Sequence, residues 1–397
     1  MYHVSLNKEE CSGCSACASI CPKQCISMVS DKEGFFYPVI NKNQCISCGR
    51  CEQVCPFNLK NADGDFIKCY YGWMLDDFER YKSTSGGAFY EIARVAFNMG
   101  ITHVYGAAFD DDQTVRHIHV ENFNDIDRLR RSKYVQSNIG YVFLEIRGFL
   151  QKGIKVLFSG TPCQVQGLLN LIPEKNKINL YTIALVCHGV SSPTVFERYL
   201  NEISKKYSGR VSSITFRDKQ VVNDRLSHKC TTIAFEDGRK IISVDNPYTL
   251  AFGIGLITRQ SCFNCPFSTP YRNADITIGD FWGIEKIYSE YAKSISKGIS
   301  LIITHTKKGE NLIKNVGVSF ELGDADLSWA INPSQPQLIH PIKKYPRRDS
   351  FMKAIAKGRE FSKRARFEIL LYKVRQSVCF RFKKIMKMIS KERKNYE

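Results

Sequence analysis

Short apolar, β-branched runs alternate with amphipathic, helix-like runs between about Phe66 and Pro341. This alternation is typical of an α/β domain with a mainly β-sheet core flanked by helices. The predicted strands are THVYGAA from Thr102, Lys155–Ser159, Tyr181–Cys187, Ala274–Asp280 and Ser300–His305. The predicted helices are AFYEIARVAFNMG after Gly87, QVQGLLNLI after Cys163 and SPTVFERYLNEISKKY after Ser191.

A different pattern covers the last part of the chain, which we treat as a basic tail over residues 342–397. Apolar residues recur there at helical spacing, at Phe367, Leu371, Val374, Val378, Phe382, Ile385 and Ile389. They predict one stripe of a long amphipathic helix. From Lys343 to Glu397 there are 19 Lys/Arg and 5 Asp/Glu, so the segment carries +14 of the chain's net charge of +18.

Basic residues around an apolar stripe suit an anionic membrane surface or the groove of a partner protein. A nucleic-acid site is not expected, because the tail offers no open groove lined with stacking aromatics. The plainer alternative is a terminal helix that packs on its own body.

An internal repeat of cysteines marks residues 1–62 as a separate α+β module. The run Cys11-x2-Cys14-x2-Cys17-x3-Cys21-Pro22 recurs 34 residues later as Cys45-x2-Cys48-x2-Cys51-x3-Cys55-Pro56. In a two-cluster ferredoxin the fourth cysteine of each run ligates the other cluster. The predicted ligand sets of the two [4Fe–4S] clusters are therefore Cys11, Cys14, Cys17 and Cys55, and Cys45, Cys48, Cys51 and Cys21.

Paired zinc sites also use four cysteines with two-residue spacings. Eight ligands in this crossed order favour paired cubanes over zinc. Cys25 lacks a partner spacing and is interpreted as a small buried apolar residue, and Cys69, Cys230 and Cys379 are interpreted as structural.

Four further cysteines lie in predicted loops of the body, at Cys163, Cys187, Cys262 and Cys265. Two of them follow strands directly, and the carboxyl ends of strands in an open α/β sheet meet at one crevice. A third cluster is one interpretation of this set. Scattered buried thiols, with Cys262 and Cys265 as half of a zinc site, are the other.

Two loops have the composition of an anion site. Residues 83–88 (STSGGA) and 159–163 (SGTPC) each open a predicted helix with small hydroxyl residues and glycine, although such residues are also ordinary helix caps. Neither a G-x-G-x-x-G after a strand nor a Walker motif is present, so a Rossmann site or a P-loop is not supported. His117 and His119 alternate along an apparent strand, where a packed pair is favoured over a metal site. His188 is expected to make loop hydrogen bonds.

Length and composition limit the remaining possibilities. A chain of 397 residues exceeds the size of one ordinary core, so a small module and a larger domain are expected. The opening MYHVSLNKEE lacks an apolar signal region, and no run approaches about 18 apolar residues, which predicts a cytoplasmic protein, with peripheral membrane contact left open. In a reducing compartment, 16 cysteines favour metal ligation or catalysis over disulfides.

Several segments resemble the β subunits of coenzyme F420 hydrogenase and dehydrogenase. They are STSGGAF, SKYVQS, SGTPCQVQGL, VCHGVSSP, RQSCFNCPF and ADITIGDFWG, and they span about Cys69 to Lys308 within a body domain of residues 66–341. The resemblance implies a flavoprotein with FAD and a [4Fe–4S] cluster in the body. It therefore favours a third cluster at Cys163, Cys187, Cys262 and Cys265.

The same resemblance suggests residues for the flavin. Ser85, Gly86, Gly87, Gly160 and Thr161 are expected near FAD, and Lys133, Tyr134 and Gln136 are expected to contact the flavin edge or the substrate. Arg131 stands where similar proteins often have a small residue, which leaves the substrate side of that loop open.

The predicted function is an iron–sulfur flavoprotein oxidoreductase that relays electrons between ferredoxin clusters and FAD. Its other substrate would be coenzyme F420 or an unknown small organic molecule, since similar proteins include F420-using enzymes, a chlorophyll-pathway reductase and relatives associated with polysaccharide synthesis. A redox partner protein or ferredoxin is expected. The alternative is an electron-transfer subunit without its own substrate, docked to a partner oxidoreductase or a membrane assembly.

Overall fold

The N-terminal module is a small unit in which short helices alternate with one β-hairpin. The computed structural model describes residues 7–58, 66 and 68–394, without the side chains of Lys293 and residues 379–394. The module contains α1 (Ala16–Ile20), β1 (Ile26–Ser30), β2 (Phe36–Ile40) and α2 (Arg50–Gln53), with β1 and β2 antiparallel. Both helices begin within a C-x2-C run, so helix starts and ligand spacing coincide.

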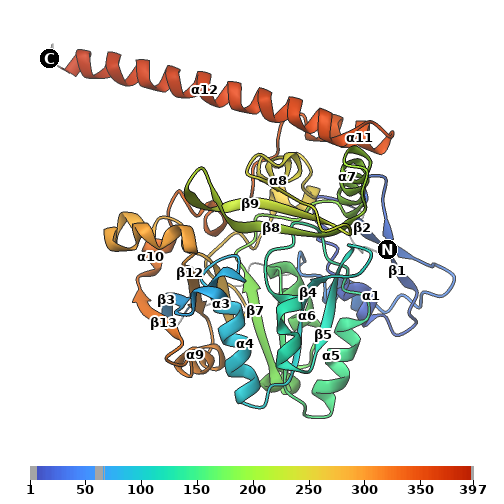
Figure 1. Ribbon diagram of the computed structural model, residues 1–397. Helices are drawn as coiled ribbons and strands as arrows, with labels where there is room; N and C mark the ends of the chain where they lie inside the picture. Colours follow the sequence, from blue (N-terminus) through green and yellow to red (C-terminus); the bar gives the residue numbers. More distant parts are fainter. Residues whose placement is uncertain (1–6, 59–65, 67, 395–397) are drawn as a thin grey trace.

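A mixed eight-stranded sheet forms the centre of the body (Figure 1). The strands β4, β6, β7 and β11 run parallel, and the pairs toward both edges are antiparallel. In sheet order the strands are β13 (Phe320–Ala325), β3 (Lys68–Met74), β12 (Ser300–Thr304), β11 (Ile276–Asp280), β7 (Leu180–Leu185), β6 (Val156–Gly160), β4 (His103–Phe109) and β5 (Val115–Val120). All five predicted strands are present, which confirms the α/β body.

Helices cover the sheet because each presents one apolar stripe to it. In α4, for example, Ile92, Val95 and Ala96 are buried against the strands. The helices of the body are α3 (Asp77–Tyr81), α4 (Ala88–Asn98), α5 (Val142–Gln151), α6 (Pro162–Leu171), α7 (Pro193–Lys206), α8 (Pro247–Gly253), α9 (Lys307–Lys314) and α10 (Leu327–Ala330). Proline in the first turn of α6, α7 and α8 fixes where these helices begin. The three predicted helices are confirmed as α4, α6 and α7.

A second sheet was not expected from the pattern. The long hairpin β8 (Val211–Val222) and β9 (Arg225–Phe235) pairs with β10 (Lys240–Ser243) and lies over one end of the central sheet (Figure 1). Its inner face packs in one apolar cluster with α7 and α8, through residues such as Phe216, Ile233 and Tyr248. Polar residues of the same strands, including Arg217 and Lys219, reach toward the central sheet.

The tail consists of α11 (Arg348–Ala356) and α12 (Phe361–Lys394), which confirms the C-terminal helix. Phe361, Ala365 and Ile369 are buried against the body, and Figure 1 shows α12 continuing well beyond it. The exposed apolar stripe of α12 differs from the predicted stripe at one position. It contains Leu370 in place of Leu371, together with Phe367, Val374 and Val378. The side chains of Phe382, Ile385 and Ile389 lie outside the described residues. Among the described helices, none combines the length and the apolar character needed to cross a bilayer.

Candidate iron–sulfur and flavin sites

The first predicted ferredoxin set gathers beside α1. Burial, with smaller contributions from the thiols of Cys163, Cys55 and Cys11, raises the pKa of the Cys14 thiol to about 12. Burial also raises the pKa of Cys17, together with Cys14, Cys11 and Cys55. Thiols that act on one another in this way lie close together. The structure thus brings together all four members of the crossed set, including Cys55 from the second run.

The second set lies around the hairpin and α2. Cys51 and Cys48 lie close enough for Cys48 to raise the pKa of Cys51, after the larger effect of burial. Cys21 and Cys45 are linked through Cys25, whose sulfur lies 3.4 Å from that of Cys21 and which also hydrogen-bonds with Cys45. Cys25 is buried, as interpreted from the sequence, yet it contacts two predicted ligands. No spacing signal could have revealed that contact. Cys69 and Cys230 are buried, whereas the side chain of Cys379 is outside the described residues.

The four body cysteines also meet. Cys163 lies in the first turn of α6 after β6, Cys187 follows β7, and Cys262 and Cys265 lie in and just after a 3-10 turn (Gln260–Asn264). Burial is the largest cause that raises the pKa of Cys187, to about 12, followed by the Cys163 thiol and, more weakly, the Cys265 thiol. Burial likewise raises the pKa of Cys262, and the other three thiols add to it. Four partly buried thiols that act on one another are the donor set that an iron–sulfur cluster needs.

Two glycines allow the chain segments around the body cysteines to pack closely on one another and on the ferredoxin module. A Cβ on Gly189 would meet Thr258 Cγ2 at 2.9 Å and Cys262 Cβ at 3.2 Å. A Cβ on Gly167 of α6 would lie 3.0 Å from the Cys14 sulfur. The body set and the first ferredoxin set are therefore direct neighbours across the α1–α6 contact.

Arg259 joins the two sets and was not foreseen from the sequence. Its buried guanidinium donates to the carbonyl of Cys11 at 2.7 Å, to the Cys11 sulfur at 3.7 Å and to Gln136 Oε1 at 3.1 Å. It also lies 4.1 Å from the ring centre of Tyr37. Arg272 faces the body set: burial lowers its pKa to about 10, while Cys187 and Cys265 act in the opposite direction. Two buried cations beside clustered thiols suit an anionic cluster.

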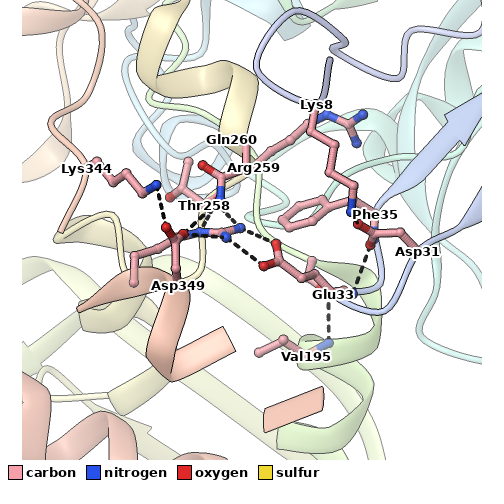
Figure 2. Close-up of polar contacts among 12 residues, drawn as sticks. Lys8, Asp31, Glu33, Phe35, Val195, Thr258, Arg259, Gln260, Lys344 and Asp349 are labelled. Carbon is pink, nitrogen blue, oxygen red and sulfur yellow. Dashed lines mark hydrogen bonds and ion pairs between the residues drawn. The ribbon is translucent and has the colours of Figure 1, made fainter. Parts of the chain in front are cut away.

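A buried ion pair fixes the module to the tail (Figure 2). Arg348 of α11 has no exposed side-chain surface, and it donates to both carboxylate oxygens of Glu33 at 2.8 and 2.6 Å. It also donates to the carbonyl of Thr258, just before Arg259, at 3.0 and 2.9 Å. Asp31 shapes the hairpin loop by accepting from the backbone N–H groups of Glu33 and Phe35. One arginine therefore holds the ferredoxin hairpin, the body and α11 together.

The two predicted flavin loops lie at different places in the body, one before α4 and the other between β6 and α6. Gly86 and Gly87 are required by packing: a Cβ on Gly86 would lie 2.3 Å from the carbonyl oxygen of Gly72, and Gly87 has a φ of 101° at the start of α4. Ser85 donates its hydroxyl to the carbonyl of Ile299 at 2.9 Å. Gly160 and Thr161 lie instead at the end of β6, where Thr161 and Gln164 form a capping box and the Thr161 hydroxyl is 3.2 Å from the Cys163 sulfur.

Lys133 and Tyr134 lie near the 83–87 loop, but Gln136 does not share their surroundings. The N–H of Ser132 donates to Thr84 Oγ1 at 2.9 Å, which joins the two loops. Burial lowers the pKa of Lys133 to about 7, and Arg131 adds to the shift. Burial raises the pKa of Tyr134, whose neighbours include Arg217 and Asp280. Gln136 contacts Arg259 and the carbonyl of Ser12, so the structure puts it against the ferredoxin module.

Polar residues of the second sheet complete the region beside the 83–87 loop. Lys219 donates to the carbonyls of Arg80 at 2.6 Å and Ser85 at 2.8 Å, and burial lowers its pKa to about 7. Arg217 pairs with Asp280 at 3.0 Å and lies 4.9 Å from the ring centre of Trp282. No sequence pattern pointed to Lys219 or Arg217, because the hairpin that carries them was not expected.

Two buried histidines leave ring nitrogens without partners among the described residues, His228 Nε2 and His117 Nδ1. Burial lowers the pKa of each to about 4. The His228 ring packs at a tilt of 37° against Trp282, with ring centres 5.2 Å apart, and lies near Arg217 and Lys219. Beside the 83–87 loop, the Arg217 and Lys219 side chains, the Trp282 ring and the unpartnered His228 Nε2 fit a bound aromatic anion, and FAD is such a molecule.

Taken together, the fold and the clustered cysteines define an iron–sulfur protein with a ferredoxin module on an α/β body. Comparisons with known proteins agree. Residues 10–59 match the 4Fe-4S dicluster domain, and residues 153–326 match the C terminus of the coenzyme F420 hydrogenase/dehydrogenase β subunit. The chain is thus similar to the F420 hydrogenase/dehydrogenase β-subunit family over residues 153–326 and matches a 4Fe-4S dicluster domain at its N-terminal end, which confirms the resemblance.

One solved structure aligns with most of the chain. It is a chain of the F420-reducing [NiFe] hydrogenase complex from Methanosarcina barkeri, determined with xenon derivatization. The TM-score is 0.44 and the identity 16%, over 70% of this chain and 93% of that chain. None of the curated proteins compared with the chain gave a match.

Proposed function

We propose that the protein is an iron–sulfur flavoprotein oxidoreductase with three [4Fe–4S] clusters and one FAD. The observation that carries the proposal is the meeting of Cys163, Cys187, Cys262 and Cys265 beside Cys14. The first two clusters would use the eight module cysteines in the crossed order, and the third would use the four body cysteines. The family match supports an oxidoreductase role.

The arrangement of the sets suggests a route for electrons from the module into the body. Cys14 and Cys163 are close enough for one thiol to raise the pKa of the other, after the larger effect of burial on Cys14. Arg259 touches the Cys11 sulfur on the module side and, on the body side, acts to lower the pKa of Cys163, which burial raises. The module would then be the electron port, and the body set the relay toward the flavin.

FAD supplies the conversion between one-electron and two-electron chemistry when it is bound. Ser85, Gly86 and Gly87 would hold it on the Lys219 side, while Gly160 and Thr161 border the body cysteines. Lys133 and Tyr134 are proposed to face the flavin or the substrate. Gln136 is proposed to position Arg259 at the interface with the ferredoxin module, and not to contact the flavin directly.

Coenzyme F420 is the proposed hydride carrier, on the strength of the family description alone. A small organic substrate, including one from polysaccharide synthesis, is the other candidate. Mixing the purified protein anaerobically with reduced F420, NAD(P)H or reduced ferredoxin and following flavin absorbance separates these options. Flavin reduction by none of the three would contradict the proposed electron relay.

Anaerobic reconstitution tests the cofactor content directly. We expect about twelve iron atoms, four per cubane, and one FAD per chain. Cys163→Ser should retain about eight iron atoms, while the control Cys69→Ser, at a buried cysteine outside all three sets, should retain all of them. Full iron in Cys163→Ser would contradict the third cluster, and full iron without any flavin affinity would contradict the flavoprotein.

A second candidate role is an electron-transfer subunit that docks through the tail. The observation that favours it is the exposed stripe of Phe367, Leu370, Val374 and Val378 on a basic helix. A partner protein of a redox complex or an anionic membrane surface could cover this stripe. Deleting residues 362–397 separates the roles: turnover with an artificial donor survives if the body is an enzyme, whereas a docking subunit loses its association.

Each part of the chain has one proposed role. Residues 1–62 would be the ferredoxin module, residues 66–341 the flavin and iron–sulfur body, and residues 342–397 the basic tail. Arg348 shows that the start of the tail also secures the module, so the tail's docking role begins beyond α11.

A further inference from the structure

Two histidines and one glutamate meet at the edge of the central sheet, and none of the three belongs to the residues proposed for the iron–sulfur clusters or the flavin. His103 begins β4, His119 lies in β5, and Glu121 directly follows β5. The register pairs Tyr105 with His119 and Val104 with Val120. Because side chains alternate along a strand, positions 103, 105, 119 and 121 share one face of the sheet.

The distances among the three side chains are those of a ligand set. His103 Nδ1 lies 2.9 Å from His119 Nε2 and 3.5 Å from Glu121 Oε1, and the three ligand atoms lie within 4.8 Å of one another. Zinc–nitrogen bonds are about 2.0–2.1 Å long, which separates two tetrahedral ligand nitrogens by about 3.3 Å. The two imidazoles therefore need to move by only a few tenths of an ångström to share an ion.

Neighbouring aromatic rings hold both imidazoles in place. His119 stacks on Tyr105, with ring centres 4.4 Å apart and planes within 4°, and His103 packs on Phe149 of α5 at 4.1 Å. Burial lowers the pKa of His119, against the opposing effect of Glu121, which favours the neutral ring that can coordinate a metal. The glutamate side chain is 63% exposed, so ions and water can reach the site.

We infer that His103, His119 and Glu121 bind one transition-metal ion of the zinc class. Two imidazole nitrogens and one carboxylate oxygen suit Zn²⁺, and also Ni²⁺ or Cu²⁺, better than Mg²⁺ or Ca²⁺, which prefer all-oxygen sites. Three protein ligands leave the fourth position to water. The ion would tie the edge strand β5 to β4.

Equilibrium dialysis of the iron-loaded full-length protein against Zn²⁺ tests the site, because bound iron occupies the cysteines that would otherwise take zinc. Wild type should bind one more zinc than a His103→Ala/His119→Ala double variant at equal iron content. Glu121→Gln should weaken this binding by about tenfold. His340→Ala, which removes an exposed histidine elsewhere, should bind as wild type does. Equal zinc in wild type and the double variant would overturn the proposal and leave only a hydrogen-bonded histidine pair.

A second measurement guards against misfolding of the histidine variants. Glu121→Gln changes an exposed side chain, so its fold should be intact. Zn²⁺ should slow amide hydrogen exchange in β5 of wild type at least tenfold more than in Glu121→Gln at the same concentration. Unchanged exchange in wild type β5, with zinc bound elsewhere, would also overturn the proposal.

Discussion

The ferredoxin cysteines and the body cysteines form similar sets by opposite means. The eight proposed module ligands lie within residues 11–55, in two copies of one local run. The body set draws Cys163, Cys187 and the Cys262/Cys265 pair from segments far apart, which meet because β6 and β7 are parallel neighbours. Local spacing specifies the first kind of site, whereas the topology of the sheet specifies the second.

The two regions also differ in what holds them together. The body has apolar clusters of its own, such as the one between α4 and the central sheet. The buried apolar residues of the module that belong to a cluster, Phe35, Cys14, Ala16 and Val54, all lie in clusters with body residues. A module this small normally needs metal or a partner to fold. We therefore expect it to depend on its clusters and on its contact with the body.

Removal of iron should separate the two regions most strongly. An anaerobic chelator should abolish the protection of module amides against hydrogen exchange, because eight thiols lose the metal that organises them. The strands β6, β7 and β12 should keep their protection. Comparable loss in both regions would show that the body, too, depends on its cluster for folding.

The ion pair of Figure 2 is the next largest expected effect. Glu33→Ala removes the carboxylate that accepts two hydrogen bonds from the buried Arg348 guanidinium and leaves only the exposed Asp349 carboxylate at 3.2 Å, so the change should cost up to about 3 kcal/mol. Chemical denaturation should report this loss, and proteases should cut the hairpin faster. Asp77→Ala is the matched control, since the Lys297–Asp77 pair is largely exposed and contributes under about 1 kcal/mol. Equal effects of the two changes would contradict the proposal that Arg348 stabilises the contact between the ferredoxin module and α11.

Arg259 allows a test of how a buried positive charge affects the proposed cluster of the first ferredoxin set. Its positive charge beside the Cys11 sulfur should favour the reduced, more negative cluster. Arg259→Gln should lower the reduction potential of the module on the order of 60 mV, the equivalent of about 1.4 kcal/mol for one electron. Redox titration followed by electron paramagnetic resonance measures this shift, and Arg239→Gln, an exposed arginine, should leave the potential unchanged. A potential that rises or stays constant in Arg259→Gln would contradict this role.

The parts of the molecule that could be predicted are those marked by a pattern within a short stretch of sequence. The x2 and x3 spacings predicted the module, and strands such as Lys155–Ser159 and Ser300–His305 stood out as short apolar runs. The β8–β9 hairpin was missed because register shifts between Thr215 and Gln220 interrupt the alternation of apolar and polar residues in β8. Arg259 and Arg348 could not be found either, because their partners Cys11 and Glu33 lie more than two hundred residues away. The family resemblance favoured a third cluster at the body cysteines, which spacing alone left undecided and which stays a prediction.

The smallest expected effect is a pH dependence of stability caused by Lys219. Its direction can be checked directly. Burial lowers its pKa to about 7, whereas an exposed lysine titrates near 10.5. Between these values the unfolded chain binds one more proton than the folded chain, so this residue makes stability rise with pH. From pH 7 to 8 the gain is about 1 kcal/mol. Thermal unfolding at the two pH values should show the gain in wild type and lose it in Lys219→Met. The matched control Lys32→Met, at an exposed lysine of the module, should retain it, and a gain that survives in Lys219→Met would assign the effect to another group.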